Sequence, residues 1–191
     1  NDRPGALALL NHAVATAPEA ARARIDLARL QHMMGDSGAA LGTLQALSRQ
    51  APAAVPLATP LMLETAIAAG QAPEMQALLQ AHYAQAPSLD VLEGIVALQA
   101  LNPTDAATAL QWYVRHLDKE QSLVAAAKWL AEEKLEHEEF HPQIQRALDH
   151  AVKPLTRYRC AACGFEARQH FWQCPGCQTW DSYPARRVEE L

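Results

Sequence analysis

The chain has 191 residues and a formal net charge of −5 at pH 7, and half of its residues are hydrophobic by a count that includes many alanines. Only 6% of the residues are aromatic, and this composition is typical of closely packed helices. Residues 1–152 contain 10 Lys and Arg against 17 Asp and Glu, whereas residues 153–191 contain 6 against 4. The acidic body argues against non-specific binding to nucleic acid.

The sequence contains no run of about 18 apolar residues, so it predicts no membrane-spanning segment. It also shows no signal peptide. It begins at Asn1 without Met, and the first expected helix, residues 4–17, looks like the second half of a helical pair. We therefore expect a fragment, from which an N-terminal anchor or further repeats could be missing.

The first 152 residues predict helices of about 12–15 residues, because apolar residues recur at helical spacing between breaks that contain Pro or Gly. The expected apolar faces are Leu27, Leu30 and Met34, then Leu110, Val114 and Leu117, then Leu123, Ala127 and Leu130. The breaks fall at Pro18, Gly35, Pro52, Gly70, Pro87, Pro103 and Pro142.

The spacing of these breaks indicates a repeat. Pro18, Pro52 and Pro87 are 34 and 35 residues apart, and Gly35 and Gly70 are 35 apart. A period of 34 residues with helix–turn–helix content is that of the tetratricopeptide repeat. The alternative is an ordinary helical bundle with accidental proline spacing, which need not present the long concave surface of a solenoid.

The repeat pattern fits best over residues 21–52. Leu27 and Ala28 form the expected pair in the first helix, Gly35 makes the turn, and the second helix is lined by Ala40, Leu44 and Leu47. Residues 56–87 fit more loosely, through Met62, Leu63, Met75 and Leu79. Residues 88–117 and 120–152 are degenerate pairs around turns at 102–105 and 136–139, and terminal repeats are commonly atypical.

All four cysteines lie within eighteen residues as two C-x-x-C pairs, Cys160 with Cys163 and Cys174 with Cys177. Two such turns supply four sulfurs in a tetrahedron, which suits one zinc or one iron ion. Two disulfides are the alternative, but this paired spacing favours metal. A thioredoxin-like redox motif needs an α/β pattern that the sequence lacks. Reduced cysteines indicate a reducing compartment.

The residues around the cysteines support a small metal-binding fold. Gly164 follows the second cysteine, where a positive φ is needed, and Gln178 stands where a second glycine is usual. We expect the aromatic side chains to pack around the metal and against the last helices, with a base-stacking platform as the alternative. They are Tyr158, Phe165, Phe171, Trp172 and Trp180.

No catalytic constellation is present. Four thiolates close the metal shell, so the site is structural or redox rather than hydrolytic. His137 and His141 flank two glutamates, but the string lacks the apolar frame of a metalloprotease helix and is interpreted as a solvated turn. No glycine-rich phosphate loop occurs. The sequence thus predicts no catalytic residue, no organic cofactor and no enzyme.

The helical repeats, followed by Tyr-x-Cys-x-x-Cys-Gly-Phe at residues 158–165 and Trp-x-Cys-Pro-x-Cys-x-x-Trp at residues 172–180, resemble the lipopolysaccharide assembly protein B (LapB) family. The resemblance is most specific over residues 141–184. It implies an N-terminal inner-membrane helix, cytoplasmic repeats and a docked rubredoxin-type metal domain. It further implies an adaptor that controls lipopolysaccharide synthesis by helping the membrane protease FtsH degrade the deacetylase LpxC.

These observations predict a mainly α fold with two domains: a tetratricopeptide-repeat solenoid at residues 1–152 and a four-cysteine metal domain at residues 153–191. The short linker 153–156 predicts that the metal domain packs on the last helical pair. We expect protein partners on the inner face of the repeats, at residues such as Arg24, Gln31 and Thr59. The alternatives are a rubredoxin-like electron carrier and a zinc-ribbon binder of nucleic acid.

Overall fold

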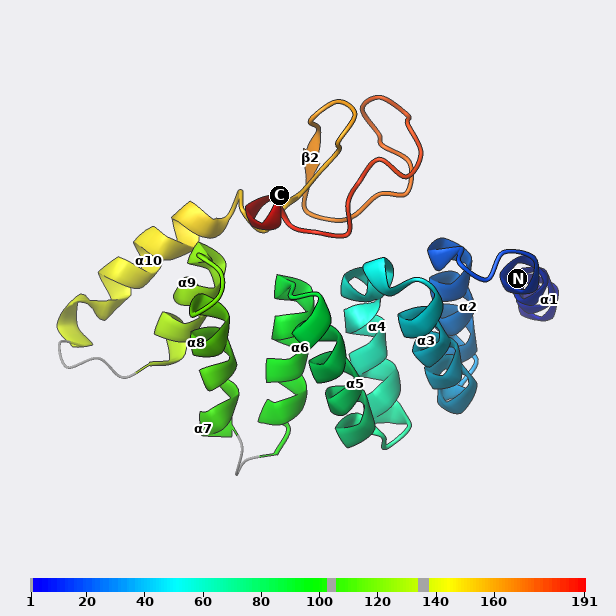
Figure 1. Ribbon diagram of the computed structural model, residues 1–191, viewed down its shortest axis with the longest axis horizontal. Coiled ribbons are helices and arrows are strands. Elements are labelled where there is room, and N and C mark those ends of the chain that lie inside the picture. The colour runs from blue at the N-terminus through cyan, green and yellow to red at the C-terminus, as the bar shows by residue number, and fades with distance from the viewer. Residues whose placement is uncertain (1, 103–105, 134–137) are drawn as a thin grey trace. The chain divides into compact units, whose positions relative to one another are not determined.

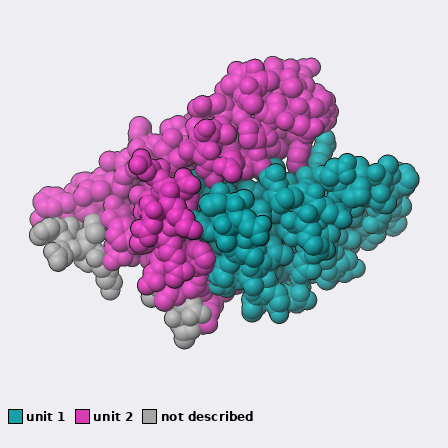
Figure 2. Space-filling model, in the orientation of Figure 1, with its two compact units in different colours: residues 1–98 teal, residues 99–191 magenta. Residues whose placement is uncertain are grey.

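The computed structural model describes residues 2–102, 106–133 and 138–191. The chain divides into two compact units, Asn1–Leu98 and Gln99–Leu191 (Figure 2). The first unit is helical throughout, and the second combines helices with the four-cysteine segment (Figure 1). The turns expected at residues 103–105 and at Glu136-His137 lie outside the described residues.

Unit 1 consists of successive helices of 12 to 14 residues, joined by short turns (Figure 1). They are α1 (Arg3–Thr16), α2 (Ala21–Met33), α3 (Ser37–Gln50), α4 (Val55–Ala68), α5 (Ala72–Gln85) and α6 (Leu89–Ala100), with the 3-10 turn η1 (Pro52–Ala54) before α4. Each of α1 to α4 packs against the next helix along the chain. This helix–turn–helix order is the one that the 34-residue period predicts.

The two glycine turns of unit 1 are copies of one another. Gly35 and Gly70 adopt φ values of +85° and +67°, which a glycine accepts without strain. The residue after each glycine donates its N–H back into the preceding helix, Asp36 to the Gln31 carbonyl at 3.0 Å and Gln71 to the Ala66 carbonyl at 2.8 Å. These bonds satisfy carbonyls that a helix end leaves without partners, so both predicted helix ends are confirmed.

Most of the predicted core of the repeats is confirmed, but the prediction is wrong for Met34, which is 43% exposed at the end of α2, and Leu63 is only half-buried. Leu27 and Ala28 of α2 are buried, as are the small and branched side chains of α3 that face them. Farther along, Met62 of α4 and Met75 of α5 are also buried. The other predicted core residues of α3 and α5 are also buried, namely Ala40, Leu44, Leu47 and Leu79.

Two of the expected partner-contact residues are buried, and that prediction is wrong for them. Arg24 is only 5% exposed, and its guanidinium donates to the Pro18 carbonyl at 2.7 Å and to the Gln50 side chain. Thr59 is 2% exposed and donates to the Val55 carbonyl at 2.9 Å. Arg24 thus ties the chain entering the repeat to the end of α3, while Gln31 stays half-buried.

Unit 2 contains shorter helices followed by two short strands. The helical elements are α7 (Ala106–Ala109), α8 (Gln111–Leu117), α9 (Leu123–Glu132), the 3-10 turn η2 (Glu138–Phe140) and α10 (His141–Val152). The strands β1 (Tyr158–Arg159) and β2 (Glu166–Ala167) pair antiparallel, with Tyr158 opposite Ala167, and the 3-10 turn η3 (Val188–Glu190) ends the chain. Helix α9 packs against both α8 and α10.

The apolar faces predicted for α8 and α9 differ from the buried ones. Val114 is 41% exposed and Leu123 is 38% exposed. Tyr113 and His116 are the buried side chains of α8, where an aromatic ring removes more apolar area from water than Val114 can. In α9 the buried face is formed by Val124, Ala125 and Ala127.

Among the described residues, no single helix combines the length and apolar character needed to cross a membrane. The segments Ser37–Gln50 and Pro52–Ala68 are long and apolar enough only when they are taken together, and the chain bends by 119° between them.

Glycine has opposite roles at two helical positions of unit 1. A Cβ added at Gly94 in α6 would collide with the Thr59 methyl and lie 3.3 Å from the Leu63 side chain, whereas one added at Gly42 in α3 would meet nothing within 4 Å. We expect Gly94→Ala to lower the free energy of unfolding by about 1–3 kcal/mol through overpacking. Gly42→Ala should raise it by up to about 1 kcal/mol through helix propensity.

Urea titration of both variants and the parent chain measures these effects. Equal stabilities of the two variants would contradict the close approach of α6 to α4.

Candidate metal centre

The four cysteines lie in two turns that repeat each other at an interval of 14 residues. In the first turn, Gly164 N–H donates to the Cys160 carbonyl at 2.9 Å, and Cys160 N–H donates to the Phe165 carbonyl at 3.0 Å. In the second turn, Gln178 N–H donates to the Cys174 carbonyl at 2.8 Å. Cys174 N–H completes that turn by donating to the Thr179 carbonyl at 2.9 Å.

Both turns use a left-handed residue directly after their second cysteine. Gly164 has a φ of 77°, as its place in the sequence predicts, and Gln178 has a φ of 61°. A residue with a Cβ is strained in this region, whereas glycine is not. The second turn therefore keeps its shape despite its sequence, and the Gln173 side chain helps by donating to the Gln178 carbonyl at 3.2 Å.

The structure brings the sulfurs of all four predicted residues together. Cys160 and Cys177 have Sγ atoms 3.8 Å apart, those of Cys163 and Cys174 are 3.7 Å apart, and all four lie within 4.8 Å of one another. None of the four forms a disulfide. An ion bound to four sulfurs at about 2.3 Å sets the edges of its tetrahedron at about 3.8 Å. The cluster therefore fits one zinc or iron ion.

The surroundings of two thiols favour the thiolate. The Ser182 hydroxyl lies 3.2 Å from the Cys160 sulfur, and this hydrogen bond, against the opposing effect of burial, lowers the pKa of Cys160 to about 6. The Thr179 hydroxyl and then its backbone N–H lower the pKa of Cys177. In the neutral thiols, Cys160 and Cys177 donate to these hydroxyl oxygens, at 3.2 and 3.3 Å. A hydroxyl that turns its hydrogen towards the sulfur stabilises the thiolate as a negatively charged ligand.

A third thiol resists ionisation. The backbone N–H of Phe165 lowers the pKa of Cys163, but burial and the other three cysteine sulfurs outweigh it and raise that pKa to about 12. Four negative sulfurs at this spacing repel one another, so the fully ionised cluster requires a cation at its centre. With four sulfur donors, such an ion has no open position at which to activate water.

Aromatic rings on one side of the cluster form the core of the small fold. Tyr158 and Tyr183 are buried, and the His170 ring meets both edge-on at centroid distances of 5.8 and 5.9 Å. His170 also contacts the Trp172 ring at 4.8 Å. The Tyr183 hydroxyl donates to the Phe165 carbonyl at 3.1 Å, which ties this core to the first cysteine turn.

Sequence reasoning missed several of these residues and misplaced others. His170 and Tyr183 were not recognised as core, although both lie among the aromatic residues of the segment, and Ser182 and Thr179 give no signal in the sequence. Phe165 is 44% exposed but packs on Gly176 of the second cysteine turn, where an added Cβ would lie 3.3 Å from its ring, so it does lie around the cluster as expected. Trp180 is 55% exposed and takes no part in the buried aromatic core.

The C-terminal turn joins the cysteine module to the helices of unit 2. The Glu189 carboxylate accepts from the backbone N–H groups of Leu123 and Val124 at 2.6 and 3.1 Å and from the Ser122 hydroxyl at 2.7 Å. An acidic side chain there satisfies N–H groups at the start of α9 and complements the helix dipole. The predicted contact between the module and the last helices is thereby confirmed.

A second set of contacts holds the same turn to the segment after α10. Val188 N–H donates to the Arg157 carbonyl at 2.7 Å, and Arg187 donates to the Thr156 carbonyl at 2.5 Å. The Arg187 guanidinium also lies 4.7 Å from the centroid of the Tyr158 ring. Residues 187–189 thus bind both the start of α9 and the segment 156–157.

Comparison with known proteins finds two family matches. Residues 158–183 match the family described as Rubredoxin metal binding domain, and residues 1–62 match Tetratricopeptide repeat. The fold class predicted from the sequence, helical repeats followed by a small four-cysteine domain, is confirmed.

The chain is also similar to Lipopolysaccharide assembly protein B of Escherichia coli K12, with 24% identity over 198 residues that cover 100% of the chain and 50% of the relative. The protein of the same name from Haemophilus influenzae is 31% identical over 39 residues, 20% of the chain and 10% of that relative. The chain thus spans about half the length of the Escherichia coli relative. The resemblance inferred from the sequence is confirmed.

We expect one metal ion per chain, bound at sulfur distances of about 2.3 Å. Elemental analysis and X-ray absorption of the purified chain measure both quantities, and Cys174→Ser should reduce the metal content sharply because Cys174 is a buried member of the cluster. Acidification should release the ion, since protons compete for the thiolates. A chain that carries no metal after reducing purification would contradict this prediction.

The two left-handed positions predict opposite effects of glycine. Gln178→Gly should stabilise the metal-loaded chain by about 0.5–1 kcal/mol by removing the Cβ strain. Gly164→Ala should destabilise it by about 1–2 kcal/mol for the same reason. Guanidinium unfolding measures both, and a loss of stability in Gln178→Gly would show that its side chain matters more than its backbone.

Removing the Glu189 carboxylate should weaken the junction with α9. We expect Glu189→Ala to lower the stability of unit 2 by about 1–3 kcal/mol, because N–H groups at the start of α9 lose a charged acceptor. Glu132→Gln, at the exposed end of the same helix, is the matched control and should have little effect. Amide exchange at Leu123 and Val124 should accelerate in Glu189→Ala alone, and unchanged exchange there would contradict the role of Glu189.

Proposed function

We propose that the chain is part of an adaptor protein that regulates lipopolysaccharide assembly, holds one zinc or iron ion through its four cysteines and has no catalytic activity of its own. The observation that carries this proposal is similarity along the whole chain to Lipopolysaccharide assembly protein B. Tetratricopeptide repeats commonly bind other proteins on their surfaces, which suits an adaptor.

In its finer form, the proposal assigns the complete protein to the cytoplasmic face of the bacterial inner membrane. There it promotes degradation of the deacetylase LpxC by the membrane protease FtsH, and so limits lipopolysaccharide synthesis. Residues 1–152 form the repeat domain and residues 153–191 the metal domain. The resemblance described for residues 141–184 supports these assignments.

The chemistry of the cluster supports a structural role for the metal. Two of the cysteines, Cys160 and Cys174, are 1% exposed, and all four sulfurs converge on one position. An ion there links the two cysteine turns, and the turns support the aromatic core that ends at Tyr183. A few residues after Tyr183, the Glu189 carboxylate accepts a hydrogen bond from the first residue of α9, Leu123. Metal binding can therefore stabilise the junction between the module and the helices.

An electron carrier is the second candidate. Cys163 and Cys177 are exposed, and Phe165 beside them is 44% exposed, so a bound iron would lie near the surface. Iron in a four-thiolate site can cycle by one electron. Voltammetry of the iron-loaded chain tests the electron-carrier hypothesis, which requires a reversible one-electron couple of the bound iron.

The adaptor role is tested in bacterial cells that lack the endogenous protein and carry the complete protein with Cys160→Ser or Cys174→Ser. We expect both variants to slow the loss of LpxC to the rate seen without the protein, because the metal module loses its fold. Gln178→Gly, which keeps all four cysteines, should restore normal turnover. Pulse-chase labelling measures LpxC half-life, and immunoblotting checks the level of each variant.

Normal LpxC turnover with both cysteine variants, at wild-type protein levels, would show that the metal module is dispensable for this role. Turnover of a substrate by the purified chain, with activity that follows metal content, would identify an enzyme instead.

A further inference from the structure

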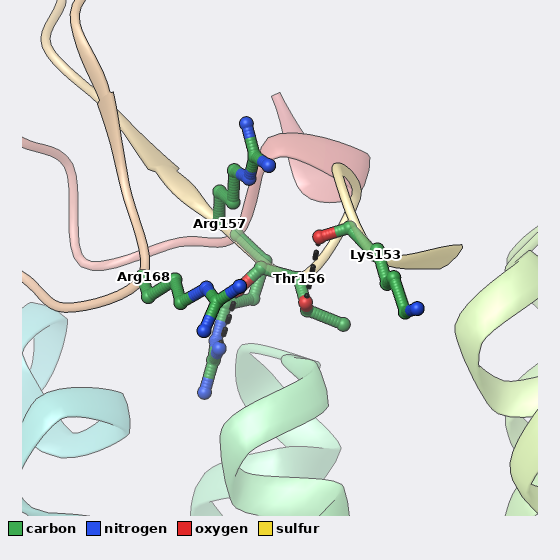
Figure 3. Close-up of a pocket in the computed structure, with 5 residues that line it drawn as sticks. Lys153, Thr156, Arg157 and Arg168 are labelled. Atoms are coloured by element: carbon green, nitrogen blue, oxygen red, sulfur yellow. Dashed lines mark hydrogen bonds between the residues drawn. The ribbon is translucent and has the colours of Figure 1, made fainter. Parts of the chain in front are cut away.

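A basic pocket lies beside the segment that connects α10 to β1. Its volume is about 350 Å³, and it is lined by Lys153, Thr156, Arg157, Arg168 and Arg187 (Figure 3). Four of these residues are cationic and none is acidic. The pocket lies within the range of volumes typical of small-molecule sites, and its charge selects for an anion.

Two of the four cations have no ion-pair partner among the described residues, namely Lys153 and Arg168. The Arg157 guanidinium is 3.5 Å from the Glu166 carboxylate, and that carboxylate also contacts Arg159 at 2.8 Å. In Figure 3 the guanidinium groups of Arg157 and Arg168 point in different directions. The charge available to a ligand therefore comes mainly from Arg168 and Lys153.

Residues 153–191 contain four acidic side chains, and two of them, Glu166 and Glu190, contact arginines that line the pocket. Glu189 accepts from the start of α9, and Glu166 is shared by two arginines. Glu190 accepts from the backbone N–H of Arg187 at 2.8 Å. The positive charge of the pocket therefore comes chiefly from Arg168 and Lys153, although the whole chain is acidic.

The side chains around Thr156 suit a phosphate group. Figure 3 shows the Arg168 guanidinium turned towards Thr156, with Lys153 on the other side of that residue and its ammonium group pointing away, so that the flexible Lys153 side chain would have to turn to reach the same ligand. A guanidinium can donate two parallel hydrogen bonds to a phosphate, and an ammonium adds a point charge. Arg187 is already oriented by its hydrogen bond to the Thr156 carbonyl and by the Tyr158 ring.

We propose that this pocket binds a phosphate-bearing anion, held by Arg168 and Lys153, with Arg187 bonded to the Thr156 carbonyl between them and lying over the Tyr158 ring. The volume leaves room for the phosphate and part of the group to which it is esterified. A soluble phosphate compound and the headgroup of an anionic lipid share this chemistry, and the experiment below separates them. The pocket contains none of the four metal ligands, and the proposal does not rest on the adaptor role.

The test uses the metal-loaded chain and inorganic pyrophosphate, titrated by calorimetry at two salt concentrations. Vesicles of phosphatidylcholine, with and without phosphatidylglycerol, form the second arm. We expect Arg168→Glu and Lys153→Glu each to weaken binding at least tenfold. Arg186→Glu is the matched control, because it makes the same change of charge at an exposed neighbour outside the pocket, and it should weaken binding less than twofold.

Binding of pyrophosphate that depends on Arg168 supports a site for soluble phosphate compounds. Binding only to phosphatidylglycerol vesicles, again dependent on Arg168, supports a lipid headgroup. Arg168→Gln removes the positive charge without adding a negative one. It should also weaken binding, which separates loss of the arginine from repulsion by the glutamate of Arg168→Glu. The proposal is overturned if neither probe binds at millimolar concentration, or if Arg186→Glu weakens binding as much as Arg168→Glu.

Discussion

Four sulfurs that converge to within 4.8 Å cannot all carry negative charge without a cation between them. The rest of the module depends on this constraint. Hydrogen bonding with Ser182 and Thr179 lowers the pKa of Cys160 and of Cys177, whereas burial and the neighbouring sulfurs raise the pKa of Cys163. A segment of this size has little apolar core of its own, so a bound ion supplies stability that packing alone would not.

A continuous series of contacts connects the cysteine cluster to the helices of unit 2, so stabilising the cluster also stabilises their junction. The first cysteine turn is tied to Tyr183 by the bond to the Phe165 carbonyl, and the chain then returns along residues 155–157. The last contact of the series is the Glu189 carboxylate, which accepts hydrogen bonds from N–H groups at the N-terminus of α9. A small domain joined by a four-residue linker could have been mobile, but these bonds fix it at two separate places.

The sequence predicted the features that depend on local spacing and missed those that depend on distant partners. The C-x-x-C pairs, Gly164 and the glycine turns of unit 1 follow from backbone geometry within a few residues. Arg24 was expected at a surface because arginine is mostly exposed, and only the approach of Gln50 and Pro18 shows why it is buried. Glu189 gave no signal, since its partners lie 65 to 67 residues away.

The basic pocket and the metal cluster are connected to the same two segments of the chain, residues 153–157 and 187–189. Arg187 lines the pocket and donates to the Thr156 carbonyl, while Glu189, two residues later, binds α9. A ligand that binds only the folded module stabilises that fold by mass action. Because metal binding also stabilises the module, the two ligands should increase each other's affinity where loss of either unfolds the segment. Reciprocal coupling of this kind needs no contact between anion and metal, since both act through the structure of residues 153–157 and 187–189.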